Sequence, residues 1–413
     1  MIWTDNRYAK GGALSILAVT SQLPWPLNSG GNIRSYHMLC AMARRFRVRL
    51  VVPIIDGNEN GIEPFLQQGI TVCPVPSGKQ TFWREVLKTA GSVLQGLPYV
   101  MYKRHERRSV RAAIISEIMR EKPDAGYLDH LDSLVYSPCF AGIPLVLDLH
   151  NMYSAVARSA AEEQSCWCRR AFLRHEARLL ERVEKSAGSV ADTIFCVSEQ
   201  EAAHFSTLGC KKVNLVPNGV DCSVYSSLPI GRKMNPPALL YVGAMSWQPN
   251  VQAARFLANE VLPKIRVQFP EARLLIVGQN PASEVTELRQ LPGVEVTGTV
   301  PQIAPYLRDA SLLAVALEAG GGTRLKILEA FAAGLPVVST PLGCEGLRVL
   351  NNEHLLIASR ECFVERIQSL LNDADLQYRL AENGRSLALE SYDWKGIGEV
   401  ACRAIEEMAQ SCD

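Results

Sequence analysis

The sequence predicts an α/β protein made of two doubly wound domains, each a parallel sheet with helices on both faces. Short apolar runs bounded by glycine or proline alternate with longer amphipathic stretches, a pattern typical of buried strands and their covering helices. This alternation starts twice along the 413 residues. The composition, 47% hydrophobic and 21% charged, is that of a globular protein with enough apolar residues for two cores.

The first series of elements runs from about Ser15 to Val216, and the second begins at Ala238. In the first series we expect the strands SILAVTS, VRLVVPI, PLVLDLH and TIFCVSE and the helix SYHMLCAMARRF. In the second we expect the strands ALLYVGA, ARLLIVG, VEVTG, SLLAVAL and LPVVST, with the helices VQAARFLANEVLPKI and TRLKILEAFAAG.

The polar stretch SSLPIGRKMNPP predicts the boundary between the domains. We expect an amino-terminal domain over residues 1–222, a linker over 223–236 and a carboxyl-terminal domain over 237–393. A final helix over about 394–413 is expected to return to the first domain. Two such domains in tandem are expected to form a cleft at the carboxyl ends of their strands, where doubly wound folds bind ligands.

The net charge, the cysteine spacing and the lengths of the apolar runs exclude several classes of protein. A formal net charge of +1 gives no general affinity for nucleic acid. Twelve cysteines without metal-ligand spacing are read as reduced thiols. Because no apolar run reaches the ~18 residues of a membrane helix, we expect a cytoplasmic protein, peripheral at most at the inner face of the cell membrane.

Positive charge is concentrated in residues 79–120, which hold nine Lys/Arg against three acids. Phe82, Trp83, Tyr99 and Tyr102 are interleaved with these cations. Such a mixture suits an anionic membrane surface or a polyprenyl-diphosphate acceptor, and a plain basic helix face explains it equally well. The later run CRRAFLRHEARLLERVEKSA is interpreted as a solvated face or an interdomain brace.

The stretch EAGGGTRLKILEAFAAG predicts a strand-end loop that leads directly into a helix. Glycines allow backbone N–H groups to approach a ligand, and a helix N-terminus adds free donors and partial positive charge. The predicted diphosphate-binding residues are Gly320, Gly321, Gly322, Thr323, Arg324 and Lys326.

A carboxylate completes this junction. Lys326 and Glu329 are three residues apart and share a helix face, so Lys326 on phosphate and Glu329 on ribose hydroxyls would fit a nucleoside diphosphate. The alternative is a tight glycine turn followed by a surface Lys326–Glu329 ion pair.

The first domain has a second glycine–helix junction. Gly30 and Gly31 follow the first strand and precede a helix expected to begin around Asn32. A simple turn between strand and helix is the alternative to a functional loop.

The strand PLVLDLH carries two polar groups at its carboxyl end. Alternation places Asp148 and His150 on one side of it. His150 is a candidate contact for a transferred sugar or a base for a hydroxyl, with a buried structural histidine as the alternative. Asp148 is expected either to orient His150 or to cap the next helix.

These stretches resemble one known family. GGGTRLKILEAFAAGLPVVSTPLGCEGL is similar to the donor-binding motif of retaining glycosyltransferases of family four (group 1 glycosyl transferases), which have the GT-B fold of two Rossmann-like domains. NLVPNGVD, LLYVGAMSWQPNVQAARFL and LLIVG resemble further segments of that family. The likeness is strongest to a branch that carries GGGTR before the helix, often found in bacterial exopolysaccharide or lipid-glycan clusters.

The resemblance implies roles for particular residues. Glu329 matches the glutamate that holds the ribose, Gly320 to Gly322 match the diphosphate loop, and Gly243 joins the donor-binding set. The Gly30–Gly31 loop would lie under the donor phosphates and beside the acceptor, and His150 matches a histidine that contacts the sugar. The sequence departs from the family at two places. Gly321 replaces the first motif glutamate, and GAMSWQPN lacks the usual cations, for which Arg324 and Lys326 are candidates.

The resulting expectation is a metal-independent, retaining transferase that moves a hexose-type sugar from a UDP- or GDP-sugar to a glycan or polyprenyl-linked hydroxyl. No metal is expected if Arg324 and Lys326 neutralise the departing diphosphate. A nucleotide-sugar 2-epimerase and a non-catalytic nucleotide-sugar-binding partner are the alternatives. A nicotinamide dehydrogenase is disfavoured, because no G-x-G-x-x-G follows the first strand of either domain.

Overall fold

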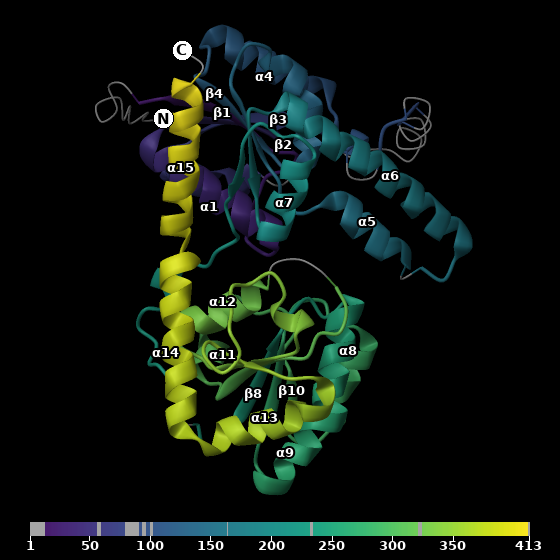
Figure 1. Ribbon diagram of the computed structural model, residues 1–413, viewed down its shortest axis with the longest axis vertical. Helices are drawn as coiled ribbons and strands as arrows, with labels where there is room; N and C mark the ends of the chain where they lie inside the picture. The colour runs from purple at the N-terminus through teal and green to yellow at the C-terminus, as the bar shows by residue number, and fades with distance from the viewer. Residues whose placement is uncertain are drawn as a thin grey trace. The chain divides into compact units, whose positions relative to one another are not determined.

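The computed structural model describes residues 13–55, 59–78, 91–92, 96–99, 102–162, 164–231, 234–320 and 324–411. The chain divides into two compact units (Figure 1). The amino-terminal unit consists of Met1–Pro217 and Ile397–Asp413, and the carboxyl-terminal unit of Asn218–Gly396. The expected linker stretch, 223–236, falls within the second of these units.

The amino-terminal unit is built on a parallel sheet of seven strands in the order β3-β2-β1-β4-β5-β6-β7. The strands are β1 (Ser15–Val19), β2 (Arg47–Ile54), β3 (Thr71–Pro76), β4 (Ala125–Asp129), β5 (Leu145–Asp148), β6 (Thr193–Cys196) and β7 (Val213–Leu215). Because β1 pairs with both β2 and β4, the direction of winding reverses beside β1. Ligands of doubly wound folds bind at such a switch point.

Helices follow most of these strands. They are α1 (Gly30–Arg45), α2 (Glu63–Gln67), α4 (Arg108–Arg120), α5 (Tyr153–Glu162), α6 (Trp167–Val190) and α7 (Glu199–Thr207), with short 3-10 turns at Glu59–Ile62, Lys103–His105 and Leu131–Phe140. Every residue of β1, β4, β5 and β6 is buried, as expected for strands covered on both faces.

The last helix of the chain, α15 (Trp394–Gln410), packs on α1. A Cβ atom at Gly398 would lie 2.4 Å from the Cβ of Ala41, so glycine is needed for the two helices to approach this closely. Arg45 of α1 reaches Glu399 at 2.9 Å and Glu406 at 3.0 Å. The amino-terminal unit is therefore completed by the carboxyl-terminal end of the chain.

The carboxyl-terminal unit contains a parallel sheet of six strands in the order β10-β9-β8-β11-β12-β13. The strands are β8 (Ala238–Val242), β9 (Arg273–Val277), β10 (Val294–Val296), β11 (Leu312–Val315), β12 (Val337–Ser339) and β13 (Leu356–Ile357). Here β8 pairs with both β9 and β11, which creates a second switch point. The two predicted doubly wound sheets are thus confirmed.

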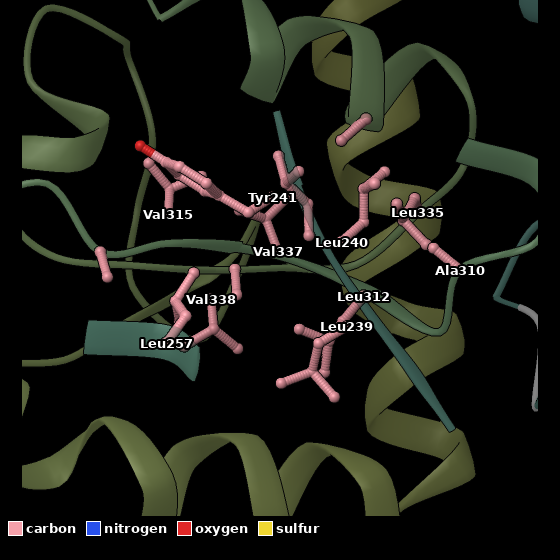
Figure 2. Packing of buried hydrophobic residues seen from close by; sticks show 14 of the residues in the cluster. Leu239, Leu240, Tyr241, Leu257, Ala310, Leu312, Val315, Leu335, Val337 and Val338 are labelled. Carbon is pink, nitrogen blue, oxygen red and sulfur yellow. The ribbon is translucent and has the colours of Figure 1, made fainter. Parts of the chain in front are cut away.

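The helices of this unit are α8 (Gln248–Phe256), a π-helical turn (Leu257–Val261), α9 (Leu262–Gln268), α10 (Ser283–Thr286), α11 (Ala304–Arg308), α12 (Leu325–Ala332), α13 (Arg360–Asn372) and α14 (Ala374–Ser391), with short 3-10 turns at Cys222–Tyr225, Glu287–Gln290 and Leu342–Cys344. Figure 2 shows side chains of β8, β11 and β12 together with Leu257 and Leu335 in the core. None of the described helices is long and apolar enough to cross a membrane.

Candidate functional site

The glycine loop after β11 is held closely against a tryptophan. Gly320 has a φ of +95°, and a Cβ atom there would lie 2.2 Å from the Trp247 indole. Both observations require glycine at this position. Gly321, Gly322 and Thr323 lie outside the described residues.

Arg324 is the N-cap residue of α12 and is almost fully buried, with 4% of its surface exposed. Its Nη2 donates to the carbonyls of Gly320 at 2.7 Å and Leu342 at 2.9 Å. Burial lowers the pKa of Arg324. The guanidinium therefore secures the loop, while the phosphate contact expected of it stays a prediction.

Lys326 lies in the first turn of α12, and its partners are uncharged. The ammonium donates to Asn250 Oδ1 at 3.1 Å and lies 4.8 Å from the centre of the Tyr241 ring. No described carboxylate is within ion-pair distance of it. Burial, and then the nearby Arg324, lowers the pKa of Lys326 to about 7. A cation without a counter-ion at a helix N-terminus is suited to an anionic ligand.

Glu329 is one turn further along α12. Its Oε1 accepts a hydrogen bond from the Tyr225 hydroxyl at 3.4 Å. Burial raises the pKa of Glu329 to about 7, against the opposing effects of Tyr225 and Lys326. The surface ion pair of the alternative interpretation is therefore wrong, because Lys326 and Glu329 are half-buried and hydrogen-bond to different partners.

Asn250 connects the end of β8 to α12. Its Oδ1 accepts from the Tyr241 hydroxyl at 2.8 Å as well as from Lys326, and its Nδ2 donates to the Ala244 carbonyl at 3.0 Å. A Cβ atom at Gly243 would lie 2.6 Å from the Asn250 amide, so Gly243 makes room for this side chain. In GAMSWQPN, where the sequence shows no cation, Trp247 contacts the glycine loop and Asn250 contacts Lys326, and neither residue was predicted.

The second glycine junction begins a helix directly. The helix α1 begins at Gly30, two residues before the start expected around Asn32, and Ser29 caps it, accepting from the Asn32 N–H at 3.2 Å. A Cβ atom at Gly31 would lie 3.4 Å from His130 Nε2 and 3.8 Å from His150 Nδ1. The first turn of α1 therefore faces two imidazoles.

Those two imidazoles stack on one another. The ring centres of His130 and His150 are 3.5 Å apart, and the planes are inclined by 37°. His130 has a φ of +68°, which is uncommon outside glycine, and its Nδ1 hydrogen-bonds to the Tyr153 hydroxyl. Burial, and then His150, lowers the pKa of His130 to about 3, so this ring stays neutral at ordinary pH. The sequence analysis did not identify His130.

His150 is paired with a carboxylate. Its Nε2 lies 2.9 Å from Asp129 Oδ1, and its Nδ1 is buried without a hydrogen-bond partner. Asp129 also accepts from the Ser35 hydroxyl at 2.8 Å. Burial acts to raise the pKa of Asp129, but the combined effect of His150 and His130 is larger, so the pKa of Asp129 is lowered. An oriented imidazole with one open nitrogen can accept a hydrogen bond or a proton from a hydroxyl.

Asp148 Oδ2 lies 3.8 Å from His150 Nε2, farther than Asp129 Oδ1 at 2.9 Å, and Asp148 does not cap the next helix. Its carboxylate pairs with Arg34 Nη2 at 2.5 Å and accepts from the Tyr127 hydroxyl at 2.5 Å, and all three side chains are fully buried. Asp129 holds the orienting place beside His150 instead. The N-terminal backbone of α5 is bonded by acids from elsewhere, since Glu201 accepts from Met152 N at 3.1 Å and Glu184 from Ser154 N at 2.9 Å.

The predicted solvated face of α6 is only partly correct. Glu176 is 3% exposed and accepts from the Tyr99 N–H at 2.9 Å, and Glu184 is fully buried. Glu181 is exposed and pairs with Arg158. Two of the three glutamates therefore bond backbone N–H groups instead of facing solvent.

Asp129, His130 and His150 have ligand atoms within 4.8 Å of one another, a spacing that a metal ion can use. In this arrangement His150 Nε2 bonds Asp129 Oδ1 directly, and the rings stack, whereas imidazoles bound to one ion direct their nitrogens at it. The geometry thus resembles a hydrogen-bonded cluster more than a metal centre.

Comparison with solved structures supports the fold class. Over 96% of this chain, the structure of Anabaena Alr3699/HepE in complex with UDP-glucose superposes with a TM-score of 0.65 at 16% identity, covering 100% of that chain. Sucrose-phosphate synthase from Thermosynechococcus elongatus superposes over 96% of this chain and 100% of its own, with a TM-score of 0.67 at 18% identity. The fold is therefore GT-B.

Family models then identify the family. The model described as Glycosyltransferase Family 4 matches residues 29–224, and the one described as Glycosyl transferases group 1 matches residues 236–373. The chain belongs to the GT-B glycosyltransferases. Glycogen synthase of Mycobacterium tuberculosis (strain CDC 1551 / Oshkosh) is 25% identical over 201 residues, 46% of this chain and 47% of that protein. The chain spans about half the length of the curated relatives it matches.

Proposed function

We propose that this protein is a retaining glycosyltransferase that moves a hexose-type sugar from a UDP- or GDP-sugar to the hydroxyl of a glycan or polyprenyl-linked acceptor. It acts in the cytoplasm, peripherally at the inner face of the cell membrane, in polysaccharide biosynthesis. The observation that carries the proposal is Lys326, a cation at the N-terminus of α12 that has no counter-ion among the described residues. HepE, in complex with UDP-glucose, has the same fold.

The proposed chemistry is electrostatic. The amides at the start of α12 and the Lys326 ammonium stabilise the departing diphosphate, while Glu329 accepts from the ribose hydroxyls. Gly243 makes room for Asn250, which holds Lys326, and Gly320 lets the loop pack against Trp247. On the acceptor side, the open Nδ1 of His150 contacts the sugar, and Gly31 keeps the first turn of α1 clear of side chains. Bound metal is not required, so activity is expected to survive EDTA.

A donor screen tests the proposal. Purified protein is titrated with UDP-, GDP- and ADP-sugars and followed by thermal unfolding, since a ligand that binds the native state raises its Tm. We expect one nucleotide sugar to raise Tm in the wild type and not in Lys326→Ala. An equal rise in both would overturn the assignment of the donor site. Retention is tested by the anomeric configuration of the product, read by NMR.

One observation favours a second candidate, a nucleotide-sugar 2-epimerase. That reaction needs several acids, bases or imidazoles in one place, and Asp129, His130 and His150 provide such a cluster. The two activities are separated by incubating the donor with and without an acceptor. Release of free epimer without acceptor identifies the epimerase, and sugar transfer with no epimer identifies the transferase.

A further inference from the structure

The hairpin formed by α5 and α6 carries a basic face that the sugar-transfer reaction does not use. The two helices lie side by side in Figure 1. We define the basic face of α6 as the exposed residues Trp167, Arg174, Arg178, Arg182 and Lys185. Their spacing places them on one side of the helix, over about 27 Å of its axis. The buried residues of α6 lie on the opposite side.

The four cations of this face have no counter-ions. None of them forms an ion pair with another described residue. Glu181 projects from the same side but is already paired with Arg158 of α5. The described cations of the 79–120 segment differ, since Lys103, Arg111 and Arg120 each pair with a glutamate.

Two large apolar side chains are exposed near the start of the same helix. Trp167 is 77% exposed and Phe172 is 39% exposed. Cys166 and Cys168, on either side of Trp167, are exposed too. A tryptophan that continues a basic face fits the boundary of a bilayer, where its ring enters the headgroup region and the cations meet anionic lipid. A soluble polyanion would use the cations but not the indole.

We propose that the basic face of α6 docks this protein on an anionic lipid bilayer, with Trp167 as the interfacial anchor. The inference rests on the acceptor side of the proposed function, in which the acceptor is carried at a membrane. It is independent of the donor site, because α6 belongs to the amino-terminal unit and Lys326 to the carboxyl-terminal one.

The test is flotation of the full chain with phosphatidylcholine vesicles, with and without phosphatidylglycerol. We expect binding to the anionic vesicles alone, weakened by salt. Arg174→Glu, Arg178→Glu and Lys185→Glu combined should reduce binding more than a hundredfold, since each cation contributes roughly fivefold before reversal. The matched control reverses exposed arginines elsewhere, Arg255→Glu, Arg379→Glu and Arg403→Glu, and should bind normally.

Three results would overturn the proposal: no flotation of the wild type at low salt, equal loss in the control, or heparin binding that depends on the cations while Trp167→Ala leaves flotation unchanged. The last would identify a soluble polyanion as the ligand. The donor-induced rise in Tm is measured on every variant. If the donor still raises Tm in a variant that no longer floats, membrane docking and donor binding are separate properties, and each proposal is judged by its own experiment.

Discussion

At Gly30–Gly31 and at Gly320 a glycine-bearing turn connects a strand to a helix, but the groups that face the two helix N-termini differ. In the amino-terminal unit Asp148 is paired with Arg34 and Asp129 with His150, and His130 is neutral. In the carboxyl-terminal unit the described partners of the Lys326 ammonium are the Asn250 amide oxygen and the Tyr241 ring. The same backbone motif therefore favours a neutral hydroxyl in one unit and an anion in the other.

The largest expected effect concerns Asp148. Replacing it by alanine leaves Arg34 buried without its partner, which costs about 3–5 kcal/mol of unfolding free energy. Urea denaturation measures this loss, and Asp375→Ala, at an exposed position of α14, is the control. A loss under about 1 kcal/mol with a large fall in kcat would instead restore the catalytic role that the sequence predicted for Asp148.

Lys326 comes next. Lys326→Ala should lower kcat/KM for the nucleotide sugar by roughly 10²–10³, the loss typical of one electrostatic contact to a leaving group. Lys264→Ala, on α9, is the control and should keep wild-type kinetics. A matching fall in His150→Ala at unchanged donor Kd would show that both units serve one reaction.

The two glycine junctions are compared directly by alanine. Gly320→Ala meets a φ of +95° and the Trp247 indole and should cost about 1–3 kcal/mol of stability, together with donor affinity. Gly31→Ala adds a Cβ at ordinary contact distance and should cost under about 1 kcal/mol. If Trp247→Ala does not recover part of the loss in Gly320→Ala, the steric explanation is wrong.

The smallest effect is a dependence of donor affinity on pH. Lys326, with a pKa of about 7 in the free protein, takes up a proton on binding diphosphate, so affinity falls as pH rises above 7. Glu329, also near 7, releases one on accepting from ribose, so affinity falls as pH drops below 7. Each arm is at most about tenfold per pH unit.

Calorimetry in buffers of different ionisation enthalpy separates these arms. Lys326→Met should abolish proton uptake above pH 7 and Glu329→Gln proton release below it. A wild-type affinity that is flat from pH 6 to 8 would contradict both assignments.

Nine strands were predicted from the sequence, because each is an apolar run bounded by turn-forming residues. They are β1, β2, β5, β6, β8, β9, β10, β11 and β12. It missed β3, which contains two prolines and lies at a sheet edge, and β4, in which Gly126 faces Phe140. β7 and β13, of three and two residues, are too short to show a pattern.

The site was predictable where it is continuous in sequence, as at Lys326 and Glu329. The partners contributed by other segments were not. Asp129 lies opposite Asp148 in the parallel register of β4 and β5, and this register places Asp129 next to His150. Asn250 and Tyr225 reach α12 from 76 and 104 residues away.

The packing of Gly398 on Ala41 has a consequence for biosynthesis. The amino-terminal unit is synthesised before α15, so its hydrophobic packing cannot be complete until α15 has left the ribosomal exit tunnel. The carboxyl-terminal unit, by contrast, is one continuous stretch of sequence and is synthesised before most of α15. In nascent chains halted before residue 397, the carboxyl-terminal unit should thus resist protease while the amino-terminal unit is cleaved.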